Sequence, residues 1–150
     1  MDCKNTSRRE FLQVGGCFAL AMAGLPVFSV SGEGAANERQ YPIPTGDSAN
    51  IDHQAQVILV RFHNNVYAFA LSCPHENAAV KWMPKDGRFQ CSKHDSRYQP
   101  DGVHTAGRAT RNMDRFAIRR EGSSVFVDTT HWFQSDKNPA GWASAVVLPA

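Results

Sequence analysis

Two short Cys and His pairs constrain this 150-residue chain more than any other feature of its sequence. Cys73-x-His75 is followed, after fifteen intervening residues, by Cys91-x-x-His94. Thiolates and imidazoles are both metal ligands in proteins, and their spacing along a chain is informative about the kind of site they form. The pattern predicts a metal centre at these four residues, and the fold must therefore bring the two segments together.

The spacing resembles that of the Rieske iron-sulfur family, in which each of two loops supplies one Cys and one His to a 2Fe-2S cluster. The resemblance implies that Cys73 and Cys91 hold one iron and that His75 and His94 hold the other. Replacing two thiolates by neutral imidazoles makes the cluster less negative, so that Rieske potentials lie at roughly −150 to +300 mV, against about −400 mV for plant-type clusters. The expected cofactor is a Rieske-type 2Fe-2S cluster.

The resemblance extends past the second pair to Ser96 and Tyr98, which stand two and four residues after His94. In quinol-oxidising members, hydroxyls at matching positions donate hydrogen bonds to a bridging sulfide and to a cysteine sulfur. Such donors around a ligand set tune a metal centre. The resemblance thus implies tuning roles for Ser96 and Tyr98; the alternative is a turn serine and a buried aromatic residue.

The chain departs from the high-potential members of the family in two ways. Those members usually carry one further cysteine in each loop and join the two by a disulfide, whereas Ala78 and Lys93 stand at the matching positions here. The loops are therefore expected to be held by packing and backbone hydrogen bonds, with a potential of intermediate value. Residues 106–110 also replace the glycine and proline run common in cytochrome bc-type members, which weakens assignment to such a complex.

A tetrahedral zinc site is the main alternative, because it also accepts two Cys and two His. Zinc fingers usually take both cysteines from one segment and both histidines from another. Each segment here supplies one Cys and one His, which favours the iron-sulfur cluster. A disulfide between Cys73 and Cys91 is a weaker alternative. The remaining histidines of the domain have no partner at ligand spacing and are assigned no chemistry: His53, His63, His104 and His131.

Residues 1–36 differ in character from the rest of the chain. A polar start is followed by a mostly apolar stretch over 11–30 and by small residues over 31–36, a profile typical of a signal peptide. Within it, the sequence Ser-Arg-Arg-Glu-Phe-Leu at 7–12 resembles the twin-arginine export signal. This resemblance implies a periplasmic protein that is exported already folded.

The predicted organisation is therefore a twin-arginine signal peptide or anchor over 1–36 and a Rieske 2Fe-2S domain over 37–150. Cleavage near 34–36 is favoured over retention, and a membrane location is expected only if the leader is retained. Since Cys3 and Cys17 lie in the leader, the domain keeps two cysteines, those of the metal-binding pattern.

Beyond the leader, apolar residues recur mainly with a period of two, which predicts an all-β domain. A tight turn is expected at Asn64-Asn65, and a short helix is expected from Pro139 through Val147. The pattern agrees with the small antiparallel β-sandwich of Rieske domains, with two cluster-binding loops at one end, over about 40–129. Three hairpins are expected, which join 56–62 to 66–71, 80–83 to 88–90, and 116–119 to 124–128.

The function expected is one-electron transfer by an exported component of an oxidoreductase, rather than catalysis by this chain alone. A formal charge of +2 without a basic block speaks against nucleic acid, and no phosphate loop or nucleophile motif is present. The expected partner is a redox protein or membrane complex, such as a periplasmic oxidoreductase or a quinol-oxidising complex, with quinol as one candidate donor. Alternatives are the small subunit of a molybdenum enzyme such as arsenite oxidase, an oxygenase ferredoxin, and a structural zinc-binding domain.

Overall fold

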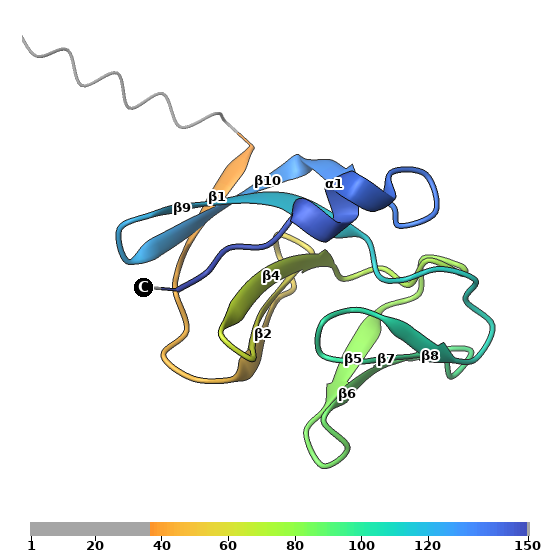
Figure 1. Ribbon diagram of the computed structural model, residues 1–150. Helices are drawn as coiled ribbons and strands as arrows, with labels where there is room; N and C mark the ends of the chain where they lie inside the picture. The colour runs from red at the N-terminus through yellow and green to blue at the C-terminus, as the bar shows by residue number, and fades with distance from the viewer. Residues whose placement is uncertain (1–36, 150) are drawn as a thin grey trace, which may run out of the picture. The chain divides into compact units, whose positions relative to one another are not determined.

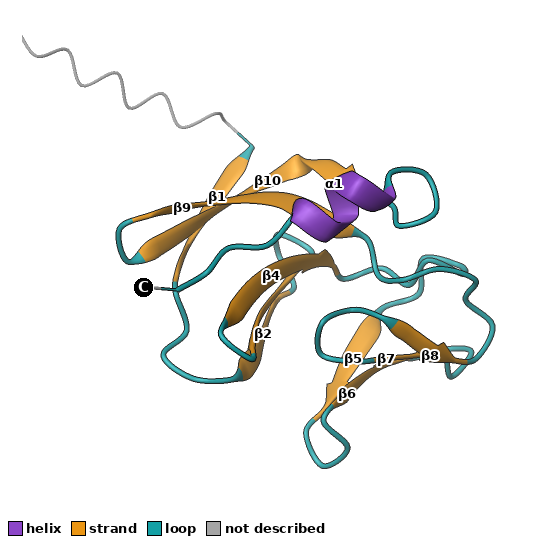
Figure 2. Ribbon diagram, in the orientation of Figure 1, coloured by secondary structure: helices purple, strands orange, loops and turns teal. Residues whose placement is uncertain are grey.

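The computed structural model describes residues 37–149, so the leader expected over 1–36 lies outside the described residues. The described chain is almost entirely β, with one short helix near its end (Figure 2). None of its helices is long and apolar enough to span a membrane. The strands are β1 (Glu38–Pro42), β2 (Ser48–Asp52), β3 (Val57–Phe62), β4 (Asn65–Ala70), β5 (Val80–Met83), β6 (Arg88–Cys91), β7 (Arg97–Tyr98), β8 (His104–Ala106), β9 (Arg115–Glu121) and β10 (Ser124–Phe133); the helix is α1 (Pro139–Ser144).

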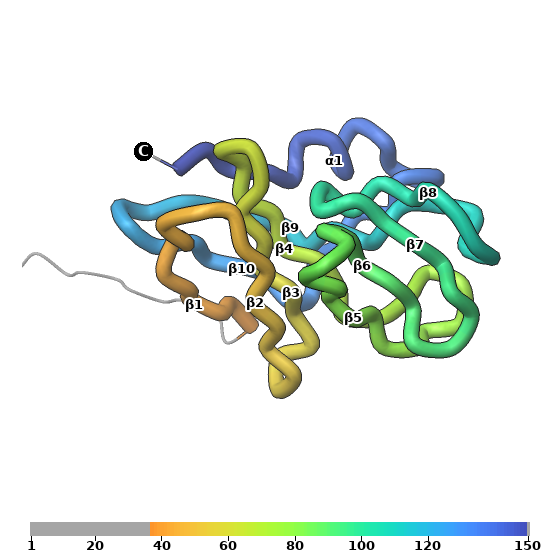
Figure 3. Tube along the Cα trace, turned by 90° about the horizontal axis from the view of Figure 1, so that it is seen from below, coloured from red at the N-terminus to blue at the C-terminus, as the bar shows by residue number. Residues whose placement is uncertain are grey.

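The strands form two antiparallel sheets. The larger sheet has the order β1-β10-β9-β4-β3-β2, and the smaller has the order β5-β6-β7-β8. The smaller sheet lies beside one end of the larger one (Figures 1 and 3). All three expected hairpins are present, as β3-β4, β5-β6 and β9-β10, which confirms the antiparallel all-β fold class.

The turn between β3 and β4 lies one residue earlier than expected. His63 and Asn64 both have positive φ, at 47° and 60°, whereas Asn65 is already the first residue of β4 and pairs with Phe62. A two-residue hairpin loop with both residues left-handed matches the right-handed twist of the strands that it joins. Asn64 tolerates this conformation readily, which explains the presence of a turn, but the position of His63 within it was not predicted.

Strands β3 and β4 are buried on both faces, so the hydrophobic core lies on both sides of this hairpin. On one face, Ile58 and Phe69 pack with Phe89 and Tyr98 of the smaller sheet, and Cys73 and Cys91 belong to the same apolar cluster. On the other face, the alternate residues of β3 and β4 pack against β9 and β10. That second cluster contains Val57, Leu59, Val66, Ala68, Phe116, Val125 and Val127. The predicted sulfur ligands are therefore part of the hydrophobic contact between the two sheets.

The carboxyl-terminal tail packs against the larger sheet. Trp142 stacks on the Arg115 guanidinium, 3.6 Å from ring centroid to Cζ, and its indole N–H donates to the Met113 carbonyl at 2.7 Å. The helix ends at Ser144 rather than at Val147, because Val147 exchanges two backbone hydrogen bonds with Val66 and so must be extended.

Trp82 and Met83, two large apolar residues of β5, are only partly exposed. Trp82 is half-buried and its ring packs at a tilt of 56° to that of Phe89, with centroids 4.8 Å apart, while 36% of Met83 is exposed. Trp132, in the tail, is the more exposed aromatic residue at 50%. The Trp82 ring therefore packs against the edge of the core.

Candidate metal centre

The two Cys and His pairs lie on neighbouring loops because strands β5 and β6 pair directly beside them. The first loop joins β4 to β5 and the second joins β6 to β7. Val80, the first residue of β5, is opposite Cys91, the last residue of β6. The Ser92 N–H donates to the Ala79 carbonyl at 3.0 Å, which ties the loops together where they leave the sheet. The fold thus brings the two predicted half-sites side by side.

Each loop turns back at the fourth residue after its cysteine. Asn77 and Asp95 occupy these places with φ of 55° and 54°. Asn and Asp enter the left-handed region at lower cost than other non-glycine residues. In the first loop the Asn77 N–H donates to the Cys73 carbonyl at 2.9 Å, and in the second the Cys91 N–H donates to the Ser96 carbonyl at 2.8 Å. The loops are therefore held by backbone hydrogen bonds, as expected without a disulfide.

Both cysteines are buried and carry free thiols, so the disulfide alternative is not what the structure contains. Burial acts to raise the pKa of the Cys91 thiol, but the backbone N–H groups of Lys93 and His94 and the side chain of Cys73 outweigh it and lower that pKa below its usual value. Because the thiolate is the form that binds metal, this environment favours ligation.

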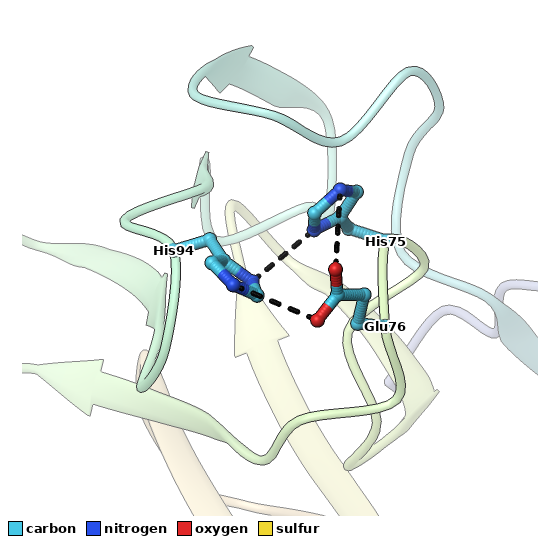
Figure 4. A group of neighbouring side chains, drawn as sticks. All are labelled: His75, Glu76 and His94. Carbon is cyan, nitrogen blue, oxygen red and sulfur yellow. Dashed lines mark hydrogen bonds and ion pairs between the residues drawn. The ribbon is translucent and has the colours of Figure 1, made fainter.

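The two histidines approach each other through their Nδ1 atoms, which are 3.2 Å apart (Figure 4). Their rings are nearly perpendicular, at 86°, with centroids 4.9 Å apart. The side chains of His75 and His94 are 25% and 18% exposed, so they lie nearer the surface than the two sulfurs. The arrangement places a nitrogen pair outside a sulfur pair.

Glu76 joins this pair of histidines and was missed by the sequence analysis. Its carboxylate oxygens lie 4.0 Å from Nε2 of His75 and 3.5 Å from Nε2 of His94 (Figure 4). The second oxygen also accepts a hydrogen bond at 3.1 Å from Lys93, which stands at one of the positions where the family often has a disulfide cysteine. The hydrogen bond from Lys93 lowers the pKa of Glu76 below its usual value, so that the carboxyl group is an anion at neutral pH. An acidic residue directly after His75 was the available signal.

The two residues with expected tuning roles are fully buried beside the cysteines. The Tyr98 hydroxyl lies 3.2 Å from the Cys73 sulfur. Burial, reinforced by the hydrogen bond to Cys73, raises the pKa of Tyr98 above its usual value, so the hydroxyl keeps its proton. The Ser96 Oγ accepts a hydrogen bond from the Ala109 N–H at 3.0 Å, which leaves the serine proton available for donation elsewhere.

Residues 106–110 pack against the second loop. Gly107 has a φ of 95°, and a Cβ atom there would lie 2.4 Å from the Ser96 Cα. Real Cβ atoms do not approach backbone so closely, so only glycine fits at this position. The segment that replaces the family's glycine and proline run therefore still contacts a predicted cluster loop.

The relative placement of sulfur and nitrogen atoms distinguishes between the two metal alternatives. Across residues 37–149, only His75, Glu76 and His94 bring three metal-binding atoms within 4.8 Å of one another, and neither sulfur belongs to that group. A tetrahedral zinc site requires all four ligands around one ion, at about 2.0–2.3 Å from it. A Rieske cluster requires a sulfur pair and a separate nitrogen pair, one for each iron. The described residues fit the two-iron centre.

Comparison with known proteins also supports a two-iron centre. Residues 35–117, more than half of the chain, match the Rieske [2Fe-2S] domain. The chain is 31% identical over 65 residues to the cytochrome b6-f complex iron-sulfur subunit 3 of Nostoc sp. strain PCC 7120, a match that covers 43% of this chain and 35% of that relative. The chain thus spans about a third of the length of the relative.

A solved structure is also similar to this chain. The crystal structure of the cyanobacterial plasma membrane Rieske protein PetC3 from Synechocystis PCC 6803 superposes with a TM-score of 0.45 and 23% identity. The superposition covers 55% of this chain and 85% of that one.

Proposed function

The chain belongs to the Rieske [2Fe-2S] domain family, and we propose that it is an exported one-electron carrier whose cluster is held by Cys73, Cys91, His75 and His94. Family membership implies a Rieske-type 2Fe-2S cluster and an electron-transfer role. The proposal goes beyond family membership in three respects: the ligand residues, the export and the partner.

The observation that carries the ligand assignment is the separation of a buried sulfur pair from a more exposed nitrogen pair. Cys73 and Cys91 are 0% and 2% exposed, and the Nδ1 atoms of His75 and His94 are 3.2 Å apart nearer the surface. The cysteines would hold the inner iron and the histidines, through Nδ1, the outer iron. The bound cluster supplies the site that accepts and releases one electron.

The chain's own residues act on that site by controlling polarity and hydrogen bonding. The packed core around Cys73 and Cys91 excludes water from the sulfur side. The Tyr98 hydroxyl, which keeps its proton, donates toward the Cys73 sulfur, and Ser96 has a proton free to donate. Donors to sulfur stabilise the reduced form, because reduction adds negative charge to the sulfur atoms. Tyr98 therefore raises the potential, and Ser96 would do the same by donating to a sulfide of the bound cluster, as the family resemblance implies.

The proposed location is the periplasm, with the leader removed, and the proposed partner is a redox protein or a membrane complex. The twin-arginine sequence at 7–12 supports export. The name of the Nostoc relative, a subunit of a cytochrome b6-f complex, supports a partner of the quinol-oxidising class. A molybdenum oxidoreductase such as arsenite oxidase is the second candidate partner. Replacing Arg8 and Arg9 by lysine should abolish appearance of the protein in the periplasmic fraction; unchanged export would refute this route.

Metal and sulfide analysis of the purified native protein tests the cluster. We expect equal amounts of iron and acid-labile sulfide, a red-brown colour, and a Rieske electron paramagnetic resonance (EPR) spectrum on reduction. A colourless protein that contains zinc and unfolds on chelation would instead establish the structural zinc alternative.

A further inference from the structure

The outer edges of both histidines face a single carboxylate. Oε1 of Glu76 lies 4.0 Å from Nε2 of His75, and Oε2 lies 3.5 Å from Nε2 of His94, while the two Nδ1 atoms face each other at 3.2 Å (Figure 4). We propose that Glu76 is a positioning residue that orients both rings through Nε2 and lowers the reduction potential of the cluster. This inference rests on the proposed function.

Orientation follows from the hydrogen-bonding capacity of the groups. An ionised carboxylate can only accept hydrogen bonds, so it favours the tautomer in which each Nε2 carries the proton. That tautomer leaves the Nδ1 lone pair of each ring free for iron. Metal-bound histidines commonly donate their second N–H to a carboxylate, which fixes the ring and increases its basicity. At 3.5 and 4.0 Å the contacts are electrostatic rather than full hydrogen bonds.

The effect on potential follows from the sign of the charge. An anion beside the outer ligands opposes the arrival of an electron and so favours the oxidised cluster. Lys93 offsets part of this charge through its 3.1 Å ion pair with Glu76. The negative end of that pair faces the rings, because it is the carboxylate that contacts both histidines. Glu76 is 45% exposed, so solvent and salt weaken its field without removing it.

A different role would produce the same contacts. Glu76 lies on the first loop and Lys93 on the second, and Lys93 stands where related proteins have a disulfide cysteine. The ion pair could therefore serve only to tie the loops. Both residues are well exposed, and exposed ion pairs contribute little to stability. A loop tie would depend equally on both partners, whereas an effect of the carboxylate charge on the cluster would not.

Three substitutions in the full cluster-loaded protein separate these roles. Glu76→Gln removes the negative charge with little change in shape, and Lys93→Gln removes the positive partner. Asp95→Asn removes a nearby negative charge that is bonded to Gln90 rather than to a histidine ring. The measurements are the midpoint potential by EPR-monitored redox titration, the histidine nitrogen couplings by pulsed EPR, and the iron content.

We expect Glu76→Gln to increase the reduced-to-oxidised ratio at a fixed ambient potential about threefold to tenfold, where tenfold corresponds to about 59 mV for one electron. Its histidine nitrogen couplings should change and its iron content should not. Lys93→Gln should shift the potential in the opposite direction, and Asp95→Asn should raise it less than Glu76→Gln does. The shift caused by Glu76→Gln should shrink with added salt.

Equal loss of iron in the Glu76 and Lys93 variants, with shifts of the same sign, would overturn the inference in favour of a loop tie. A shift no larger than that of Asp95→Asn, with unchanged histidine couplings, would also overturn it, because Glu76 would then be one surface charge among several. Wild-type protein that lacks iron and labile sulfide would overturn the proposed function itself, an outcome visible before any variant is compared.

Discussion

The Tyr98 hydroxyl lies 3.2 Å from the Cys73 sulfur, so a residue on the strand after the second loop contacts the cysteine of the first. Both side chains are completely buried, and the contact lies in the apolar cluster between the two sheets. Because the tyrosine keeps its proton, this contact is a hydrogen bond from a fixed donor to the sulfur of a proposed ligand. It connects the two halves of the site without a covalent bond.

Replacing Tyr98 by phenylalanine should therefore lower the reduction potential while the cluster remains bound. Loss of one hydrogen bond of about 1 kcal/mol corresponds to roughly 40 mV for one electron. A redox titration followed by EPR measures the change. Tyr41→Phe is the control, since that hydroxyl bonds to Asp52 instead of to sulfur. An unchanged potential in Tyr98→Phe would contradict the tuning role.

Substitution of His94 by alanine should abolish the Rieske spectrum but not the fold. The side chain is 18% exposed and lies outside the apolar core, so its removal costs little packing. Visible and EPR spectra of the reduced protein should lose the Rieske features, while the far-ultraviolet circular dichroism should be retained. The matched control is His53→Ala, at an exposed position for which no ligand role was predicted. Retention of a normal Rieske signal in His94→Ala would remove this histidine from the ligand set.

Alanine at Gly107 should destabilise the protein by more than alanine at Gly87. Both glycines have positive φ, at 95° and 59°, which costs a residue with a side chain about 1–2 kcal/mol. At Gly87 the added Cβ meets nothing within 4 Å, whereas at Gly107 it would meet the Ser96 backbone. Relief of that clash would also disturb the hydrogen bond from Ala109 to Ser96, worth about another 1 kcal/mol. Urea unfolding of both variants checks the difference, and equal losses would show that the close approach is unimportant.

The contribution of Tyr41 to stability should disappear in alkali. Burial and the hydrogen bond to Asp52 raise the pKa of Tyr41 to about 12, from 10. Between these two values the unfolded state has lost the tyrosine proton and the folded state has kept it, so stability falls as the pH rises. The difference in unfolding free energy between wild type and Tyr41→Phe should therefore narrow from pH 9 to pH 11. A constant difference over that range would show that the pKa is not raised by folding.

The central hairpins could be predicted because their signals are local. Strands β5 and β6 flank a Pro-Lys-Asp-Gly turn, and β3 and β4 are rich in β-branched and aromatic residues. Strands β1 and β2 were not predicted, because their sequences are mostly polar and each lies at an edge of the larger sheet. β1 depends on pairing with β10, more than eighty residues away in the chain, and no local pattern encodes that contact.

The candidate site also combines a feature that the local sequence predicts with one that depends on the fold. The spacing of Cys73, His75, Cys91 and His94 was sufficient to predict that two loops meet, and the loops do meet. The spacing of Cys and His residues is a strong signal because few kinds of metal site share the same spacing of ligands. An acidic residue after His75 is visible in the sequence, but its contact with both rings could not be predicted, because that contact depends on how the first loop turns at Asn77. Side chains whose position is set by a turn are not visible in a spacing pattern.

The location of Cys73 and Cys91 between the two sheets has a consequence for biogenesis. Their sulfurs belong to the same apolar cluster as Phe69 and Phe89, so they become inaccessible once the sheets have packed. If these cysteines hold the cluster as proposed, iron and sulfide have to reach them before that closure is complete, and a finished apoprotein would have to reopen its interior to be loaded. Maturation of the cofactor and the last step of folding would then be a single event, which fits the export of an already folded protein that we propose for this chain.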